Sequence, residues 1–189
     1  SGRTDETLGP VYGKQWRDFE GVDQLKNIVY SIKNNPSSRR LMVSAWAPQD
    51  MKDMALPPCH YAFQIYINNG KLDLMWMQRS VDTFLGLPYD IAMYGLLLEM
   101  LAKGADLIPG ELIGQFGDCH LYNNHLEQAK LYLSRPNRAL PQLELESGIN
   151  ISSDKSVVPD YLNIPHKFEI KLINYNPYAA IKAELSVGK

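Results

Sequence analysis

The sequence feature that most constrains the fold is a pair of extended segments joined by a two-residue turn. Residues 60–68 and 71–80 are rich in aromatic and aliphatic side chains, and Asn69-Gly70 separates them. Asparagine followed by glycine readily adopts positive φ angles, which suits the tight turn of a β-hairpin. In residues 71–80 both alternating sets of side chains are largely apolar, so we expect this strand to be covered on both faces.

The rest of the chain predicts helices and further strands. Apolar residues recur at helical spacing from Leu25 to Ile32, in a helix that should end before Pro36. A longer helix is expected from Pro88 to about Lys103, with Gly104 as its stop. The other expected elements are a strand over 41–46, extended chain over 110–118, a helix over 122–134, surface loop within 136–165, a strand over 166–173 and an irregular tail. This mixture predicts the α/β (α+β) class.

Length and composition narrow the possible functions. The 189 residues fit a single domain, expected to span residues 1–189. A formal charge of −2 gives no broad basic surface, which argues against a duplex nucleic acid as partner. The apolar stretch Ile91–Ala102 contains Glu99 and is too short for a membrane span of ~20 residues. No secretion signal is expected at the start of the chain.

The two cysteines, Cys59 and Cys119, make neither a disulfide framework nor a zinc motif. We therefore expect no metal site. Reduced thiols in the cytoplasm are the simplest interpretation, so we predict a cytoplasmic protein.

Three blocks combine a thiol with basic and polar groups. They are Leu56-Pro57-Pro58-Cys59-His60, Gln78-Arg79-Ser80-Val81-Asp82 and Gly117-Asp118-Cys119-His120-Leu121-Tyr122. An arginine near Cys59 would favour the thiolate, which is the reactive form. The planar group of arginine also suits phosphate oxygens. On the residues alone, Cys59 could equally be a buried inert thiol, Arg39-Arg40 a solvated surface, and His120 a structural histidine.

Together with Leu8-Gly9-Pro10-Val11-Tyr12-Gly13-Lys14-Gln15-Trp16-Arg17, these blocks resemble those of the thymidylate synthase family. The resemblance runs nearly continuously from Leu8 to about Glu184. It implies a layered fold with a twisted mixed sheet and a long central helix. It also implies an enzyme that transfers one carbon from 5,10-methylenetetrahydrofolate to C5 of a deoxypyrimidine 5′-monophosphate. In that chemistry Cys59 adds to C6 of the ring and makes C5 nucleophilic.

The resemblance assigns roles to further residues. Arg39, Arg40 and Arg79 clasp the phosphate, and the Arg39-Arg40 pair reaches into the partner's site across a homodimer. His120 and Tyr122 bind the 3′-hydroxyl, and their spacing of two puts them on one side of an extended segment. The other matches are Gln78 and Ser80 at the substrate, Asp82, Gly86 and Asp118 around the folate and the base, and Tyr175 at the cofactor and the nucleotide's sugar.

Some of these matches have simpler explanations or structural consequences. Asp82 could equally cap a turn, and Gly86 could simply permit a backbone angle. On a regular strand Arg79 faces away from Gln78 and Ser80. Convergence of the three on one ligand therefore predicts a bulge or bend at this point.

Asp90 departs from the family pattern, which usually has asparagine at this position. An asparagine amide can donate to uracil O4 and accept from N3–H, whereas an ionised aspartate only accepts. Cytosine presents an amino group at C4, which suits an acceptor. Asp90 therefore favours a cytosine nucleotide, as in the related deoxycytidylate hydroxymethylases. A protonated or averted Asp90 would still allow uracil.

The family's opening third has no counterpart in this chain, including a glutamate that organises proton transfer and an arginine loop that closes on phosphate. The chain is therefore either a piece of a longer protein or a reduced homologue. Methylation of the thymidylate synthase type is the leading hypothesis. A hydroxymethylase, in which water adds in place of hydride, is the first alternative. A non-catalytic nucleotide-binding homologue is the second.

Overall fold

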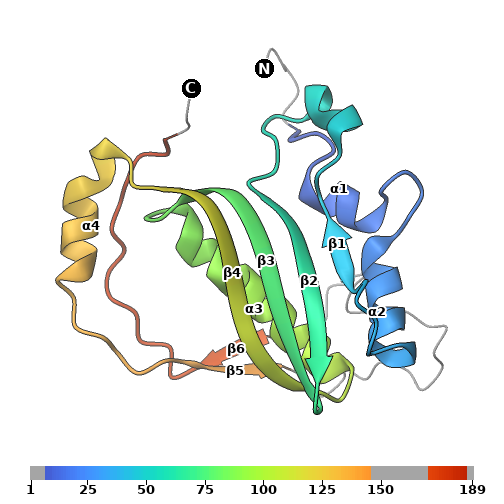
Figure 1. Ribbon diagram of the computed structural model, residues 1–189. Coiled ribbons are helices and arrows are strands. Elements are labelled where there is room, and N and C mark those ends of the chain that lie inside the picture. Colours follow the sequence, from blue (N-terminus) through green and yellow to red (C-terminus); the bar gives the residue numbers. More distant parts are fainter. Residues whose placement is uncertain (1–6, 146–169, 187–189) are drawn as a thin grey trace.

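The computed structural model describes residues 7–145 and 170–186 and has a four-stranded sheet at its centre (Figure 1). In order across the sheet, the strands are β1 (Met42–Ser44), β2 (His60–Asn68), β3 (Lys71–Asp82) and β4 (Ile108–His120). β1 and β2 pair antiparallel, and so do β2 and β3, whereas β3 and β4 pair parallel. This mixed sheet with its helices confirms the predicted α/β class.

The predicted hairpin is confirmed by β2 and β3. Asn68 pairs with Lys71, and the φ angles of Asn69 and Gly70 are 49° and 75°. Two consecutive positive φ angles are what a two-residue hairpin turn of this kind requires. The pairing continues from the turn to the other end of β2. The turn thus sets which residues of β3 lie beside the block that contains Cys59.

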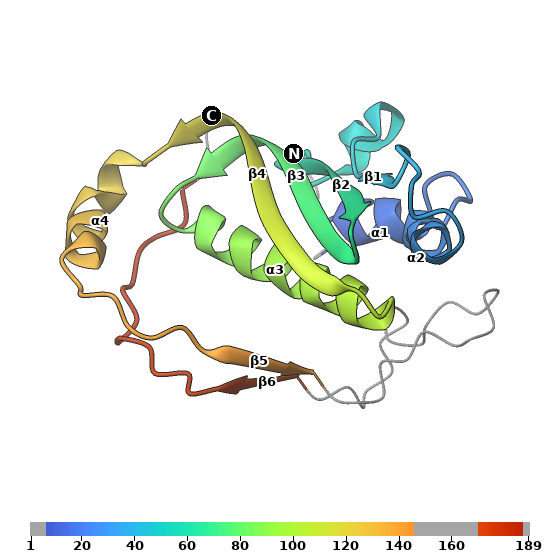
Figure 2. The same ribbon diagram turned by 60° about the horizontal axis from the view of Figure 1, so that its bottom comes forward.

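Helix α3 (Gly86–Gly104) connects β3 to β4 and packs across the sheet (Figure 2). A helix is the usual connection between parallel neighbouring strands. It begins earlier than predicted, after a turn in which Asp82 Oδ1 accepts hydrogen bonds from the N–H groups of Phe84 and Leu85 at 3.0 and 3.1 Å. Gly104 is the last residue of the helix rather than a stop beyond it.

Helices α1 (Tyr12–Arg17) and α2 (Gln24–Asn34) lie on the same side of the sheet as α3 (Figures 1 and 2). The side chain of Asp23 caps α2, which ends before Pro36 as predicted. The apolar stripe of α2 joins the sheet and α3 in one core. Its buried members include Leu25, Ile28, Val29, Ile32, Val43, Phe63, Ile65, Leu72, Leu74, Trp76, Tyr94, Leu98 and Leu101.

The remaining elements are short. A 3-10 helix, η1 (Pro48–Asp53), follows β1, which is shorter than the predicted strand. The predicted helix after β4 is confirmed as η2 (Asn123–His125) and α4 (Leu126–Leu133). Strands β5 (Gln142–Leu145) and β6 (Ile170–Ile173) form an antiparallel pair, so the surface loop predicted within 136–165 does not include 142–145. The expectations for residues 146–169 lie outside the described residues, and the tail after β6 is irregular as predicted.

The two faces of β3 differ in the cover that the helices give them. Leu72, Leu74 and Trp76 are buried against the helices, whereas Met75 and Met77 point to the opposite face and are half-buried. Helices α1, α2 and α3 all lie on the first face (Figures 1 and 2). In the described part of the chain, helices thus cover one face of β3, and Met75 and Met77 stay partly exposed on the other.

The apolar stretch 91–102 belongs to α3 and contributes Tyr94, Leu98 and Leu101 to the core, as a core helix should. In the parts of the chain that the structure describes, no helix has both the length and the apolar character needed to cross a membrane.

Replacing Leu74 by alanine should test the core, because this side chain is 0% exposed between β2, β4 and α3. We expect Leu74→Ala to lower the free energy of unfolding by about 2–5 kcal/mol, from lost burial and the cavity left behind. Urea denaturation measures this change. Tyr66→Ala, at a position that is 61% exposed on the same hairpin, is the control and should cost clearly less. Equal losses in the two variants would contradict the assigned core.

Candidate active site

Cys59 lies directly before β2, and its backbone is held from two sides. Its N–H donates to the Tyr12 hydroxyl at 2.9 Å, and its carbonyl accepts from the Arg79 N–H at 2.9 Å. Pro58 is buried, whereas Cys59 is a free thiol of intermediate exposure. Proline restricts the backbone that leads to the thiol. The structure thus presents the thiol at the end of the sheet on a restrained segment, rather than packing it into the core.

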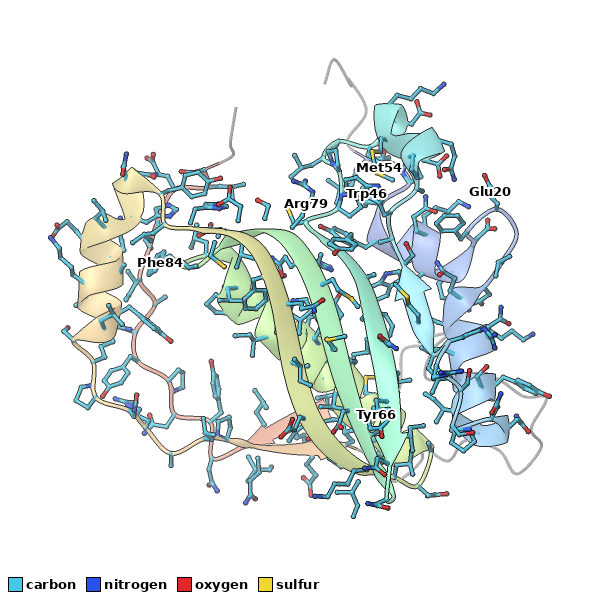
Figure 3. All side chains as sticks on the ribbon, viewed as in Figure 1. Glu20, Trp46, Met54, Tyr66, Arg79 and Phe84 are labelled. Carbon is cyan, nitrogen blue, oxygen red and sulfur yellow. The ribbon has the colours of Figure 1, made fainter. Side chains whose placement is uncertain are left out.

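The Arg79 side chain folds over the segment that precedes Cys59. Its Nε donates to the Pro58 carbonyl at 2.9 Å, and its Nη2 donates to the Pro57 carbonyl at 3.0 Å. The guanidinium carbon lies 5.9 Å from the centre of the Trp46 ring. Figure 3 shows Arg79 and Trp46 close together at one end of the sheet. A guanidinium has five N–H donors, so donors remain for an anion after these two bonds.

The bend predicted beside Arg79 is present, but it lies in the neighbouring strand. His60 pairs with Gln78, and Ala62 pairs with Met77, so one extra residue of β2 bulges between these pairs. The part of β3 beside the site pairs regularly with β4. The prediction of a bulge within β3 is therefore wrong. The irregularity lies in β2 instead.

His60 sits between two tyrosines. Its Nδ1 lies 2.8 Å from the Tyr94 hydroxyl oxygen, and its ring stacks on Tyr12 with the ring centres 4.1 Å apart. Burial lowers the pKa of His60, and the negative charge of Asp90, whose Oδ1 is 3.9 Å from Nε2, opposes this shift. Burial raises the pKa of Tyr12 to about 12, and it raises the pKa of Tyr94 well above its usual value. The two phenols are therefore neutral near pH 7.

Gln78 joins the sheet to the base-reading candidate Asp90. Its Nε2 donates to Asp90 Oδ2 at 2.8 Å and to the Ser80 carbonyl at 3.1 Å. Its Oε1 accepts from the indole N–H of Trp76 at 3.0 Å. Gln78 is buried, and Asp90 is of intermediate exposure on the first turns of α3. Asp90 is therefore held by the sheet and is not turned away from it.

The end of β4 brings the third sequence block beside the second. Ser80 pairs with Asp118, and Asp82 pairs with His120. The rings of His120 and Tyr122 have centres 5.0 Å apart. Asp118 is exposed, with Oδ1 3.5 Å from His120 Nδ1. The structure therefore gathers these polar groups at the same end of the sheet as Cys59.

Asp82 and Gly86 each have a simpler structural explanation, a turn cap for Asp82 and a special backbone angle for Gly86. The first holds in part, and the second fails. Asp82 does cap the turn before α3, as the hydrogen bonds to Phe84 and Leu85 show. Gly86 has no positive φ, so a special backbone angle does not explain it. A Cβ at this position would lie 3.4 Å from Asp82 Cβ and 3.9 Å from Asp90 Oδ2. A side chain at position 86 would thus begin in ordinary van der Waals contact with these two candidate site residues.

Tyr175 is 59% exposed and lines a hollow of about 640 Å³ between the start of α3, the end of α4 and the tail. The walls include Phe84, Leu85, Pro88, Tyr89, Tyr132, Arg135, Arg138 and Tyr178. A hollow of this size with aromatic walls suits a flat ring system, and arginines suit carboxylates.

Arg39 and Arg40 are exposed and do not join the group around Cys59. They precede β1, whose Met42 pairs with Gln64. Extrapolating this antiparallel pairing puts Arg40 level with Tyr66, roughly 20 Å along β2 from His60. The structure thus separates these two arginines from the thiol of their own chain.

Sequence reasoning missed three residues that shape the site, namely Trp46, Trp76 and Tyr94. Tyr94 follows Asp90 by one helical turn, and this spacing could have shown that both point to the same side of α3. Trp76 belongs to one of the two apolar sets of residues 71–80, and this alternation says nothing about a partner for its indole N–H. No sequence pattern pointed to Trp46, because its position beside Arg79 depends on the fold.

The geometry is that of an α/β domain built around a candidate thiol nucleophile. A family model described as thymidylate synthase matches residues 2–187. Proteins named thymidylate synthase from Mycoplasma pneumoniae and Mycoplasma mobile are each 49% identical to this chain over 181 residues, which is 95% of this chain and 59% of each relative. A crystal structure of thymidylate synthase from T4 phage matches with a TM-score of 0.82 and 43% identity, covering 98% of this chain and 66% of that chain.

The chain belongs to the thymidylate synthase family. It spans 59% of the length of the curated relatives it matches. The resemblance inferred from the three sequence blocks is thereby confirmed, and so is the layered fold that it implied.

Replacing Arg79 by lysine should loosen the segment before Cys59. Lysine keeps the charge but cannot donate to the Pro57 and Pro58 carbonyls from one planar group. We expect a loss of about 1 kcal/mol in unfolding free energy and faster proteolytic cleavage near exposed Leu56. Arg40→Lys, at an exposed position, is the matched control and should change neither quantity. Cleavage that is equally slow in both variants would contradict this role of Arg79.

Proposed function

We propose that this protein transfers one carbon unit from 5,10-methylenetetrahydrofolate to C5 of a deoxypyrimidine 5′-monophosphate, with Cys59 as the nucleophile. The observation that supports this most is that Arg79 binds the backbone of the segment that carries Cys59, while the Gln78–Asp90 pair lies beside His60, the next residue, in a chain of the thymidylate synthase family. A sulfur–C6 bond would place the ring electrons at C5, which then takes up the carbon unit and releases its proton. The folate supplies that carbon unit when it is bound.

The residues that we propose to bind the nucleotide lie at the same end of the sheet as Cys59. Arg79 has unused N–H donors for the phosphate, with Ser80 next to it in the strand. His120 and Tyr122 form a close pair for the sugar hydroxyl. Gln78 and Asp90 read the base.

The aromatic hollow near Tyr175 is the place that we assign to the folate. Its walls of Phe84, Tyr89 and Tyr132 suit a flat ring, and Arg135 and Arg138 suit acidic groups at the other end of the molecule. Gly86, the first residue of α3, lies beside Asp82 and Asp90, and the preceding Leu85 lines this hollow. These residues fit the cofactor that the family resemblance implies.

Membership of the thymidylate synthase family supports dUMP, whose base is uracil, whereas the chemistry of Asp90 by itself favours cytosine. Gln78 already donates to Oδ2, so the carboxylate offers Oδ1 as a further acceptor. The amino group of cytosine can donate to it, whereas uracil O4 cannot. Position 90 does not distinguish hydride from water as the group that completes the reaction. Methyl transfer is the leading hypothesis for the reaction because the resemblance to thymidylate synthases extends over nearly the whole chain. Hydroxymethylation is the alternative.

We also propose a homodimer formed through the open face of the sheet. Strand pairing places Met42, Gln64, Met75 and Ile113 in one row, and Met42 and Ile113 are 49% and 40% exposed. Packing against a second copy would bury this row, since apolar side chains on an open sheet face favour association. The Arg39-Arg40 pair, distant from its own thiol, is then available to the partner's phosphate site.

A 5-fluoro-deoxypyrimidine monophosphate tests the nucleophile. Fluorine at C5 cannot leave as a proton does, so the complete protein should retain nucleotide and folate covalently on Cys59. Intact mass and peptide mapping measure the adduct. Cys59→Ser is the matched control and should show none, whereas Cys119→Ser should form it normally.

Absence of an adduct from the complete protein would contradict the proposed chemistry. If calorimetry then still shows nucleotide binding, the result favours the non-catalytic nucleotide-binding alternative.

The base can be tested by tritium release from C5-labelled dCMP and dUMP. If an ionised Asp90 decides the base, the wild type favours dCMP by about tenfold or more, because an acceptor that faces O4 loses a hydrogen bond and leaves a charge unpaired. Asp90→Asn should reverse the preference, since its amide can donate to O4. A clear wild-type preference for dUMP would contradict this interpretation of Asp90, and Asp90→Asn should then change little.

A further inference from the structure

His125 is a buried side chain that the proposed chemistry does not use. It is the last residue of η2, directly before α4, and it is 0% exposed. Its Nε2 lies 2.7 Å from the carbonyl oxygen of Glu184 in the tail. A backbone carbonyl only accepts hydrogen bonds, so Nε2 carries a proton and is the donor. Nδ1 has no hydrogen-bond partner in the described part of the chain, so the bond to Glu184 is the one that the ring makes there.

The neighbours of the His125 ring belong to both candidate binding regions. Its centre is 5.5 Å from that of Phe84, which lines the hollow near Tyr175. It is 5.8 Å from the ring centre of Tyr122, one of the pair proposed for the sugar hydroxyl. The main-chain N–H of His125 also donates to the Tyr122 carbonyl at 2.9 Å. His125 is therefore fixed to the chain that leaves β4, and it gives the tail a firm point of attachment beside the hollow.

The tail that His125 holds forms one wall of that hollow. It has no regular secondary structure and runs beside α4 (Figures 1 and 2). Residues 175–181 line the hollow. Arg135 and Arg138 fix the first part of this wall, because they donate to main-chain carbonyls within 176–179. The last part of the wall lies beyond these bonds, so its position depends on where the tail is held next.

Two attachments follow along the tail. His125 holds the Glu184 carbonyl, and Asn124 holds the Ser186 hydroxyl at 2.9 Å. The contact of Asn124 joins two polar side chains at an exposed position, where water competes for both groups. The bond from His125 is shorter, comes from a buried donor and lies nearer to the hollow along the chain. A second, smaller hollow of about 330 Å³ lies between residues 182–184 and the start of α4, so little packing can replace this bond.

We propose that His125 is a positioning residue for the folate, because its hydrogen bond to Glu184 holds the far end of the tail wall against which the cofactor packs. This rests on the proposed assignment of the hollow to the folate. His125 is not among the described residues that line the hollow, so it acts through the tail and not by contact. Without the N–H the wall can move away from Phe84 and Leu85 on the opposite side, and the folate loses contacts. The nucleotide site is held by strand register and keeps its own.

The test separates the hydrogen bond from the ring in the complete protein. His125→Phe keeps an aromatic ring beside Phe84 and Tyr122 and removes the N–H. His125→Gln removes the ring, but its amide nitrogen stands the same number of bonds from Cα as histidine Nε2 and can still donate to Glu184. If His125→Phe does not fold, the smaller His125→Leu takes its place, since it also lacks a donor.

Three quantities are measured for each protein. Calorimetry gives the dissociation constant of dUMP alone, and that of tetrahydrofolate, which has no carbon unit to transfer, in the presence of saturating dUMP. Trypsin cleavage after exposed Lys182, followed by intact mass, reports how often the tail leaves its place. Cleavage elsewhere in the chain is the internal reference.

We expect His125→Phe to raise the dissociation constant of tetrahydrofolate about threefold to tenfold, the effect of one hydrogen bond, and to speed cleavage after Lys182 by a similar factor. The dissociation constant of dUMP should change less than about twofold, and His125→Gln should resemble the wild type in all three quantities. Unchanged tetrahydrofolate binding in His125→Phe overturns the proposal. An equal loss in His125→Gln also overturns it, because the ring and not the bond would then matter, and so does an equal weakening of dUMP.

Failure of the proposed function gives a different result. A wild type that binds dUMP but no tetrahydrofolate shows that the hollow is not a folate site, whatever the variants do. A wild type that binds both, together with a His125→Phe variant that binds both equally well, leaves the proposed function standing and overturns the role of His125 alone.

Discussion

The pairing of β2 with β3 is the constraint on which the rest of the candidate site depends. The turn at Asn69-Gly70 starts this pairing, and the bulge in β2 ends it with His60 opposite Gln78. Cys59 then lies beside Arg79, whose backbone N–H and guanidinium both bind the segment before β2. A slip by one residue would turn every β3 side chain to the opposite face and remove Gln78 from Asp90. The thiol and the base-reading pair therefore depend on the same strand register.

Helix α3 completes the site because its start is anchored to the end of β3. Asp82 belongs to the strand, yet it caps the turn that leads into the helix. This places Asp90 within 2.8 Å of Gln78, and Tyr94 one turn later within 2.8 Å of His60. Two hydrogen bonds thus connect the helix to two adjacent strands. Buried polar groups are costly unless paired, so these contacts also restrict how the helix can pack.

Local patterns predicted much of the fold. The hairpin, the helix before Pro36 and the long central helix follow from turn chemistry and periodicity, which depend on neighbours in the chain. The bulge was expected next to Arg79, but the strand that carries it depends on partner strands. The open face of β3 could not be predicted either, since apolar side chains do not show what covers them. The candidate residues were found in the sequence blocks, while their hydrogen-bond partners were not.

The sequence by itself determined which chemical groups are available, namely a thiol after two prolines, an arginine, a histidine–tyrosine pair and an aspartate in place of asparagine. It also carried enough of the family's blocks to indicate the family. Only the tertiary structure decided that Trp76 donates to Gln78, that Gln78 donates to Asp90, and that Arg79 binds the carbonyls before Cys59. The physical reason is that a hydrogen bond depends on distance and direction between groups far apart in the chain. Strand register and helix packing set these, and residue identity alone does not.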